Sequence, residues 1–320
     1  MKVYVTGAGG MIGSHLIEIL SKRGFQTFGS YYHPTVDVKD IDLTDNFFFE
    51  LDIRDAEKIF KFLESEKPQC IFHLAAQSFP VLSWEDPYYT MDVNVKGTIG
   101  IFESIRKVQL IDPSYNPVII VITSSAIYGE ALLKYDENHL PDESCELIPL
   151  HPYGVSKAAQ DFLCYQYYKN YNLKTIRVRL FNCTGPRKIG DISSDFARRA
   201  VELWRENKNE LMVGSLSAHR AILDVRDLCE GLIILANKGK PGEAYNICSS
   251  HIFPMTHVVE CLENIMGVKY KINPNQKLFR PADEKLYAGN CDKIKALGWE
   301  EKYNYYDTLK NIVDYWKSKI

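Results

Sequence analysis

The sequence predicts an α/β fold in which helices cover both faces of a doubly wound parallel sheet. Short apolar runs alternate with longer amphipathic stretches as far as about residue 180, which is the rhythm of alternating strands and helices. The runs expected to form strands are 3–6, 70–75, 118–123 and 175–180. A glycine-rich segment follows the first of these runs, and this order is typical of a Rossmann-type domain.

Length and pattern predict a smaller second lobe after this domain. The chain has 320 residues, more than the roughly 100–200 of a typical domain. Beyond residue 180 the pattern is mixed, with helices expected near 196–205 and 225–236, a strand near 211–213, and a loop in the Pro- and Asn-rich run 272–276. We expect a Rossmann-type domain over 1–180 and a mixed α/β substrate lobe over 181–320, with some strands and helices returning to the first domain.

Composition argues against several classes of partner. A net charge of −3 with 25% charged residues gives no basic patch for nucleic acid, and no stretch approaches the ~18 apolar residues of a membrane span. The eight cysteines are scattered singly without a CxxC pair, so we expect reduced thiols and no metal site. Met1 leads directly into the first strand without a signal peptide, and we therefore expect a soluble, cytoplasmic protein.

The glycine-rich segment has the spacing of a dinucleotide-binding loop. Gly7 permits a tight turn, Gly10 lets the backbone approach a pyrophosphate, and Gly13 allows close packing of helix on strand. Because a helix is expected to begin near Ser14, its free N–H groups would face the anion. An ordinary glycine-rich turn is the alternative, but the strand before and the helix after favour dinucleotide binding, with Met11 and Ile12 in the same loop.

The end of the second strand bears on the choice of cofactor. A site specific for NAD usually offers a carboxylate here, whereas the segment from Phe28 to His33, which includes Tyr32, has none. NADP is therefore favoured, although the arginine expected for its 2′-phosphate is also missing and NAD stays possible. Asp52, beside Ile53, follows an apolar strand end and could accept from an adenine amino group; a helix N-cap or a solvated loop acid is an equally good interpretation.

Tyr153 and Lys157 are four residues apart at the start of an amphipathic stretch, so both project from one face of a helix. An ammonium beside a phenol lowers the phenol pKa from about 10 toward neutrality, which suits proton exchange with a substrate hydroxyl. An isolated pair of this kind is more often structural, but its position after a glycine-loop domain and a Ser-containing strand end favours a catalytic role. Ser124 and Ser125 end a central strand, where a hydroxyl could bind the reacting oxygen or merely cap a loop.

Together these residues resemble the extended short-chain dehydrogenase/reductase family, also known as the NAD-dependent epimerase/dehydratase family, which modifies nucleotide sugars. The matching positions are Gly7, Gly10, Gly13, Asp52, 73–77, Asn94, Ser124, Tyr153 and Lys157. The resemblance implies an NAD(P) site that includes Leu74, Ala75 and Ala76. It further implies Tyr153 as acid/base, Lys157 on the nicotinamide ribose, and Ser124 on the reacting oxygen.

Within that family the chain is most similar to the branch of GDP-mannose 4,6-dehydratase and GDP-4-keto-6-deoxy-mannose reductase. The likeness lies in 180–187, 213–220 and 280–283. It implies that a nucleotide diphosphate sugar is held by Arg220 and Arg280 on its phosphates and by Asp283 on a ribose. The same substrate site is expected to include Ser125, Asn182 and Arg187; for Arg187 a solvated surface charge is an equal alternative.

Two departures from the branch bear on the reaction. The dehydratases carry a glutamate where this chain has Ala126, so dehydration here would need a substitute such as Glu130 or a water. Ala221 replaces an aspartate that usually follows Arg220. We therefore expect a reductase acting at C4 of a 4-keto-6-deoxy sugar. A 4,6-dehydratase with a displaced acid/base, a C4 epimerase and, remotely, a non-catalytic dinucleotide sensor are the alternatives.

The resemblance also implies a homodimer. The family usually pairs the helix that carries Tyr153 and the helix near 98–106 with their counterparts in a four-helix bundle. An apolar and aromatic face made by Phe162, Leu163, Tyr165 and Tyr168 fits such an interface.

Overall fold

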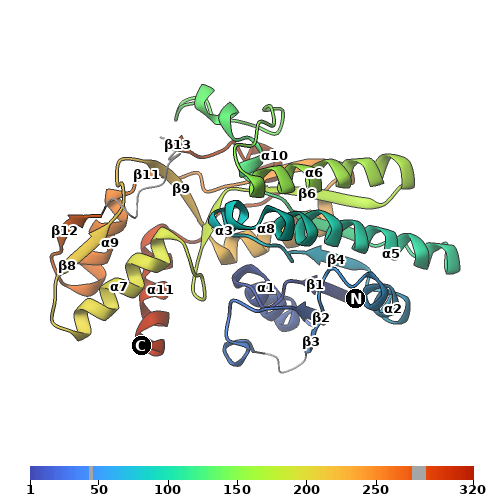
Figure 1. The fold of residues 1–320 in the computed structure, drawn as a ribbon, viewed down its shortest axis with the longest axis horizontal. Coiled ribbons are helices and arrows are strands. Elements are labelled where there is room, and N and C mark those ends of the chain that lie inside the picture. Colours follow the sequence, from blue (N-terminus) through green and yellow to red (C-terminus); the bar gives the residue numbers. More distant parts are fainter. Residues whose placement is uncertain (43–45, 276–285) are drawn as a thin grey trace.

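A computed structural model describes residues 1–42, 46–275 and 286–320 of the chain. The described residues form a seven-stranded sheet in the order β10-β6-β5-β4-β1-β2-β3, with every neighbouring pair parallel (Figure 1). Its strands are β1 (Lys2–Thr6), β2 (Gln26–Tyr31), β3 (Asn46–Glu50), β4 (Cys70–His73), β5 (Val118–Ile122), β6 (Lys174–Leu180) and β10 (Ala244–Ile247). The predicted doubly wound α/β fold is confirmed.

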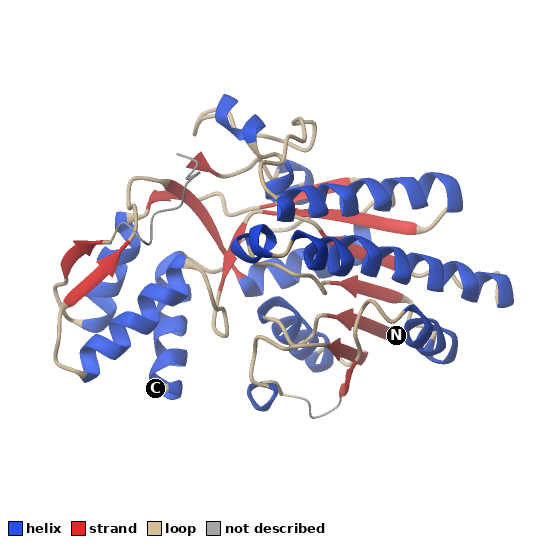
Figure 2. Ribbon diagram, in the orientation of Figure 1, coloured by secondary structure: helices blue, strands red, loops and turns tan. Residues whose placement is uncertain are grey.

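Helices cover both faces of this sheet, as Figure 2 shows. One face carries α1 (Met11–Lys22) and α8 (Val225–Lys238), and the other carries α2 (Ala56–Glu66), α5 (Gly97–Ile111) and α6 (Pro152–Tyr171). Alternate residues of β1 enter different cores: Val3 and Val5 pack with Leu16 of α1, whereas Tyr4 packs with Phe102 of α5. Because successive side chains of a strand point to opposite faces, the apolar run of β1 is buried on both sides.

Shorter elements shape the edge of the sheet where the strands end. They are η1 (Val38–Asp40), α3 (Pro80–Glu85), α4 (Pro87–Met91), the π-helix η2 (Asp92–Lys96), η3 (Ser125–Ile127), η4 (Glu130–Lys134) and α10 (Asp292–Lys295). The helices α3 and α4 contact α6, so they lie beside the helix that was predicted to carry Tyr153 and Lys157.

A second lobe is built around its own apolar core. It contains α7 (Ile192–Arg205), α9 (Thr256–Met266), α11 (Tyr305–Lys319), and the strands β7 (Asn182–Thr184), β8 (Glu210–Val213), β9 (His219–Asp224), β11 (Ile252–Pro254), β12 (Lys271–Pro274) and β13 (Leu286–Tyr287). Phe196, Leu211 and Ile312 are among the residues that fill this core. By contrast, α8 and β10 pack in the first domain although they lie beyond residue 180. The boundary at 180 stays a prediction.

The prediction of a loop over 272–276 is wrong for residues 272–274, which belong to β12. β12 pairs in parallel with β8, with Lys271 opposite Glu210 and Pro274 opposite Val213. All four residues of β12 are exposed, so this strand has no buried face and shows none of the apolar alternation by which a strand is recognised. Pro274 lies at the strand end, where a missing N–H costs the ladder least.

Candidate active site

A cavity of about 940 Å³ opens at the carboxyl ends of the central strands, between the Rossmann-type domain and the second lobe. Strand ends at such a point bring together loops from several βα units, and ligands of open α/β sheets bind there. From the first domain the cavity is lined by the glycine loop and by residues that follow β2, β3, β4 and β5. From the second lobe it is lined by residues of α7 and by the segments around β7 and β9.

The glycine loop has the close contacts that its spacing predicted. Gly7 has a φ of +69°, and a Cβ atom on it would lie 2.7 Å from the backbone N of Ala75. A Cβ on Gly13 would lie 2.3 Å from the carbonyl O of Gly7, so only glycine fits both positions. Gly10 is the N-cap of α1 and has no capping side chain, so the first N–H groups of the helix are open to an anion. This cradle fits the pyrophosphate of a dinucleotide.

The other predicted cofactor residues also line the cavity, namely Met11, Ile12, Tyr32, Asp52, Ile53, Leu74, Ala75 and Ala76. Asp52 is bound by Arg54, whose Nε lies 3.0 Å from each carboxylate oxygen and whose Nη2 lies 2.6 Å from Oδ2. Burial acts to raise the pKa of Asp52, but hydrogen bonds from Arg54 outweigh it and hold the pKa below its usual value. Asp55, rather than Asp52, caps α2.

Ser124, Tyr153 and Lys157 converge on one wall of the cavity. A side-chain hydrogen bond joins Tyr153 to Ser124, which directly follows Thr123 at the end of β5. The Nζ of Lys157 lies 5.9 Å from the ring centroid of Tyr153 and donates to the carbonyl O of Ile122 at 2.9 Å. The wall therefore places two hydroxyl groups and an amino group beside the glycine cradle.

The prediction that Lys157 lowers the pKa of Tyr153 is wrong for the protein without a bound cofactor. Burial raises the pKa of Tyr153 to about 12, and the hydrogen bond with Ser124 offsets this only in part. Burial also lowers the pKa of Lys157 to about 7. Desolvation disfavours the charged forms of both groups, and for Tyr153 it outweighs the hydrogen bond with Ser124. Tyr153 is consequently protonated at neutral pH.

A neutral histidine supports the floor of the site. His73 bonds through Nδ1 to Thr6 Oγ1 and through Nε2 to Thr98 Oγ1, both at 2.9 Å. Burial and the nearby Lys157 lower its pKa to about 3. Thr6 Oγ1 also accepts from the N–H groups of Leu74 and Ala75 at 3.1 Å, which fixes the strand end against the glycine loop.

On the substrate side the structure brings Asn182, Arg187 and Arg220 to the cavity. The Nδ2 of Asn182 and the Nη1 of Arg187 are buried without a hydrogen-bond partner among the described residues. The Nη2 of Arg187 donates to Glu18 Oε1 at 2.8 Å and to the carbonyl O of Asp40 at 2.7 Å. Arg187 is thus paired inside the protein rather than solvated, with one nitrogen left to donate.

Three further residues predicted to bind the substrate are not among the described residues that line the cavity. Ser125 donates to the hydroxyl of Tyr287 at 2.6 Å and is not among the cavity-lining residues. Arg280 and Asp283 lie outside the described residues.

Sequence reasoning missed two cations of the second lobe. Lys188 and Arg199 line the cavity with Arg187 and Arg220, as do the carboxylates Asp191 and Asp195. A signal for Arg199 exists in the sequence, because four of the five lining residues of α7 follow the i, i+3, i+4, i+7 spacing of one helix face. These four are Ile192, Asp195, Phe196 and Arg199, and the fifth is Ser193. The excess of cations gives this side of the cavity a net positive charge, which suits a diphosphate.

The catalytic wall offers no carboxylate within the described residues. The described acids that line the cavity are Asp52, Asp191 and Asp195. None of them belongs to the part of the sequence from β4 to α6, which supplies the catalytic wall. Ala126 lies in η3, and Glu130 is exposed and does not line the cavity. Glu130 is therefore not placed to act as the substitute base for dehydration.

Comparison with known proteins identifies the family. The family model described as GDP-mannose 4,6 dehydratase matches residues 4–312. The chain belongs to this family. It is thus a member of the extended short-chain dehydrogenase/reductases, whose nucleotide-sugar dehydratases, reductases and epimerases depend on NAD(P), and the predictions of family and enzyme class are confirmed.

Individual relatives cover essentially the whole chain. GDP-6-deoxy-D-mannose reductase of Pseudomonas aeruginosa is 24% identical over 325 residues, which are 100% of this chain and 98% of the relative. Among solved structures, a UDP-glucose 4-epimerase of Thermotoga maritima with UDP-glucose has a TM-score of 0.88 at 24% identity, covering 100% of this chain and 99% of the other. The protein RMD of Pseudomonas aeruginosa complexed with NADPH has a TM-score of 0.83 at 24% identity, with the same coverage.

Proposed function

We propose that this member of the family is an NADP-dependent reductase that delivers hydride to C4 of a GDP-linked 4-keto-6-deoxy-hexose. The observation that carries the proposal is that Ser124, Tyr153 and Lys157 share one wall of the cavity. Among the described residues, no carboxylate lies on that wall. Reduction of a ketone needs a hydride and a proton donor. Dehydration needs, in addition, a group that takes the C5 proton.

The residues of the cradle fit a nicotinamide dinucleotide, which would supply the hydride when bound. The glycine loop and the open N-terminus of α1 would hold its pyrophosphate, and Asp52 its adenine side. The end of β2 has no carboxylate to repel a 2′-phosphate, and this supports NADP over NAD. The similarity to RMD of Pseudomonas aeruginosa, which is complexed with NADPH, supports the same choice, whereas a similar UDP-glucose 4-epimerase of Thermus thermophilus is complexed with NAD.

Tyr153 would give its proton to the C4 oxygen as that oxygen becomes an alcohol. Because its pKa is raised, Tyr153 carries the proton that reduction requires. Ser124 would donate to the same oxygen and hold it near Tyr153. Lys157 would bind the nicotinamide ribose and stabilise the phenolate left behind.

The cationic side of the cavity would bind the diphosphate of the substrate. Arg187, Lys188, Arg199 and Arg220 can together offset two phosphate charges. GDP is proposed as the nucleotide because the family model is that of GDP-mannose 4,6 dehydratase and the similar reductase acts on a GDP sugar.

A C4 epimerase is the second candidate, because epimerisation at C4 also uses Tyr153 and Ser124 and needs no acid at C5. The two reactions differ in what happens to the hydride. We expect that NADPH deuterated at the transferred position of its nicotinamide places deuterium at C4 of the product sugar, as seen by NMR. Product without deuterium at C4 would count against the reductase.

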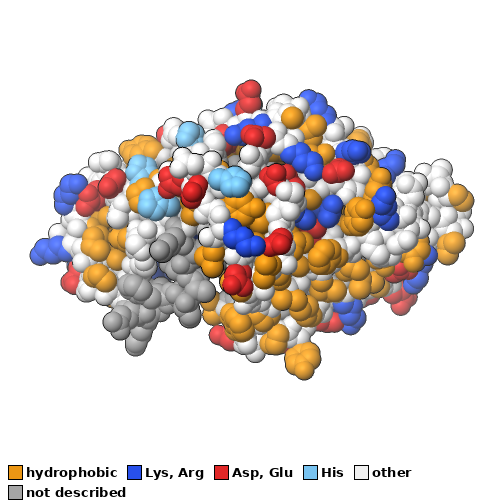
Figure 3. Space-filling model, turned by 90° about the horizontal axis from the view of Figure 1, so that it is seen from above, with side chains coloured by type: hydrophobic (Ala, Val, Ile, Leu, Met, Phe, Trp, Pro, Cys, Tyr) orange, Lys and Arg blue, Asp and Glu red, His pale blue; other side chains and the backbone are white. Residues whose placement is uncertain are grey.

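The exposed face of α6 supports the proposed homodimer. Trp84, Tyr88, Phe162 and Tyr165 are exposed on α3, α4 and α6, which contact one another. Figure 3 shows hydrophobic side chains gathered on one side of the molecule as seen from above. Monomeric proteins rarely expose so many large apolar side chains together. Light scattering at micromolar concentration should give twice the 36.8 kDa chain mass, and a monomer mass would refute the dimer.

Two further findings concern the helices and the cysteines. Among the described residues, no helix combines the length and apolar composition that a membrane crossing requires. All eight cysteines are buried free thiols. The thiols support the proposed cytoplasmic location, since disulfides are rare there.

A further inference from the structure

The first half of α6 is held in place by polar contacts more than by apolar packing. Its buried side chains there are Ser156, Lys157, Ala158, Gln160 and Asp161. Larger apolar anchors come only later, with Cys164 and Tyr167. Polar contacts have fixed lengths and directions, so a satisfied polar network defines one arrangement of the elements that it joins. The position of Tyr153 on this half of the helix therefore depends on these contacts.

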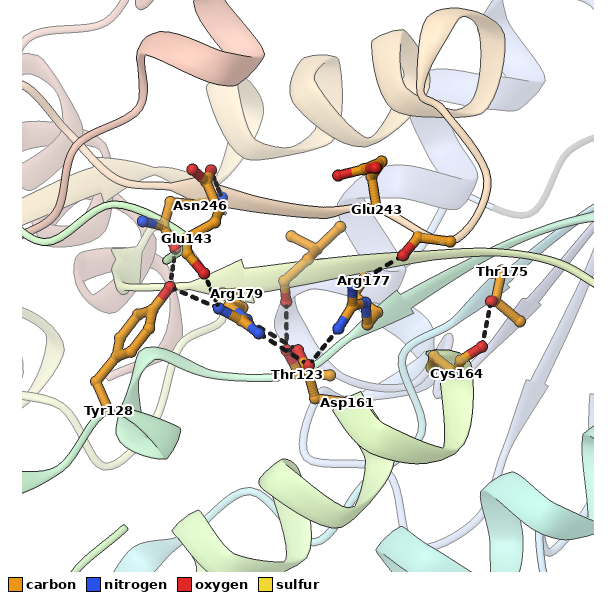
Figure 4. A network of polar contacts seen from close by, with 12 residues as sticks. Thr123, Tyr128, Glu143, Asp161, Cys164, Thr175, Arg177, Arg179, Glu243 and Asn246 are labelled. Carbon is orange, nitrogen blue, oxygen red and sulfur yellow. Dashed lines mark hydrogen bonds and ion pairs between the residues drawn. The ribbon is translucent and has the colours of Figure 1, made fainter. Parts of the chain in front are cut away.

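Asp161 lies on the same helix face as Tyr153 and Lys157, because the three are spaced four residues apart. Its side chain is 0% exposed. As Figure 4 shows, it faces two arginines of β6. Oδ1 accepts from Arg177 Nη1 at 2.8 Å and from Arg179 Nη2 at 3.0 Å, and Oδ2 accepts from Arg179 Nε at 2.9 Å. Two guanidinium groups thus share one carboxylate.

The same network reaches the strand end that carries Ser124. Thr123 precedes Ser124, donates to the carbonyl O of Val178 at 3.0 Å, and has its Oγ1 3.5 Å from Asp161 Oδ2. Arg179 continues the network through its Nη1, which donates to Tyr128 Oη at 3.2 Å and to the carbonyl O of Glu143 at 2.8 Å. Asp161 therefore connects α6, β6 and the end of β5.

The opposite flank of α6 has neutral contacts. Asn94 Nδ2 donates to Ser156 Oγ at 2.9 Å, and Gln160 Nε2 donates to Thr98 Oγ1 at 2.7 Å. A neutral contact that is lost leaves dipoles unpaired, whereas loss of Asp161 would leave two buried cations without their carboxylate. The arginines would then have to move, and α6 would follow them.

We propose that Asp161 is a positioning residue that keeps Tyr153 and Lys157 aligned with Ser124. Asp161 does not line the cavity and acts through Arg177, Arg179 and the helix. The inference rests on the proposed function, because it assumes that those three residues carry the reaction. A displacement of about 1 Å at a reacting group can lower a rate by about 10²-fold.

The test compares Asp161→Asn with Asp224→Asn. Asp224 is an equally buried carboxylate that binds Arg226 and Thr308 and does not line the cavity. We expect Asp161→Asn to lower kcat by about 10²-fold at saturating cofactor, with the KM for the sugar nucleotide little changed. Asp224→Asn should lose thermal stability but keep kcat within about twofold of the wild type, because Asp224 shares no partner with Asp161 and does not line the cavity. Equal kcat losses in the two variants would overturn the inference.

Two more variants distinguish an effect on the alignment of Tyr153 and Lys157 from an effect on the thermal stability of the fold. Asp161→Glu keeps the charge but pushes the arginines outward, and it should lower kcat while the fold is kept. The combined change Asp161→Leu, Arg177→Met and Arg179→Met removes every buried charge of the triad and should recover thermal stability without recovering kcat. Recovery of kcat together with stability would show that Asp161 has only a structural role.

A binding measurement tests the inference even if the sugar substrate is misassigned. Calorimetry with Asp161→Asn should show NADPH bound about tenfold more weakly, the effect of one misplaced charge-assisted hydrogen bond at Lys157. Adenosine 2′,5′-bisphosphate, which lacks the nicotinamide ribose, should bind as to the wild type. If Asp161→Asn binds both ligands as the wild type does, the inference is overturned whatever the turnover. If the wild type binds NADPH but reduces no sugar, only the proposed function is contradicted.

Discussion

Lys157 donates from Nζ to the carbonyl O of Ile122 at 2.9 Å and thereby ties α6 to β5, the strand that leads to Ser124. This hydrogen bond directs the Lys157 amino group toward β5 in the protein without a bound cofactor. It also places a lysine in an environment where burial lowers its pKa to about 7.

Burial of Lys157 predicts a pH-dependent stability. An unfolded chain keeps this proton up to about the usual pKa of 10.5, whereas the folded chain releases it near 7, so the free energy of unfolding rises with pH between these values. From pH 7 to 9 the gain should be about 2 kcal/mol. Urea unfolding of Lys157→Met should lose this gain, and Lys169→Met, at an exposed lysine of the same helix, should keep it. An unchanged pH profile in Lys157→Met would contradict the assignment.

Tyr153→Phe should abolish turnover while leaving cofactor affinity nearly unchanged. The substitution removes the proton donor and keeps the buried ring, and loss of general acid catalysis should cost about 10²-fold or more in rate. Steady-state kinetics and calorimetry on the same preparation measure both effects. A variant with near-full turnover would show that Tyr153 is structural.

Gly13→Ala should weaken binding of the cofactor. Its new Cβ would lie 2.3 Å from Gly7 O, so the loop would have to move away from the position that receives the pyrophosphate. Affinity for NADPH should fall by about tenfold or more, the equivalent of one lost charge-assisted hydrogen bond. Gly100→Ala is the matched control, because its Cβ would have no neighbour closer than 3.6 Å. Equal affinities for the two variants would refute the role given to the loop.

Arg199→Met should raise the KM for the nucleotide sugar. Arg199 lines the cavity, whereas its neighbour Arg198 pairs with Glu202 and does not line it. A lost arginine–phosphate contact should raise KM by about 10- to 10²-fold. Arg198→Met should leave KM unchanged. If neither variant alters KM, the diphosphate is bound elsewhere.

Much of the fold and of the catalytic wall could be predicted from the sequence because the signals there are local. The glycine spacing, the apolar strands and the pair Tyr153 and Lys157 depend on residues a few positions apart. The exposed strand β12 was predicted as a loop, and the cation Arg199 was missed, because both depend on which face of an element meets a distant segment. The pKa of Tyr153 was predicted in the wrong direction because proximity to an ammonium is visible in sequence spacing, whereas burial is not.

The stoichiometry of cofactor oxidation tests most directly whether the enzyme transfers hydride from NADPH to C4 of the sugar. The purified chain is given a GDP-linked 4-keto-6-deoxy-hexose with NADPH and, separately, GDP-mannose without added cofactor. We predict one NADPH oxidised per 4-keto sugar consumed, followed by absorbance and NMR, and no reaction of GDP-mannose. Formation of a 4-keto-6-deoxy product from GDP-mannose, with no net oxidation of NADPH, would contradict the account.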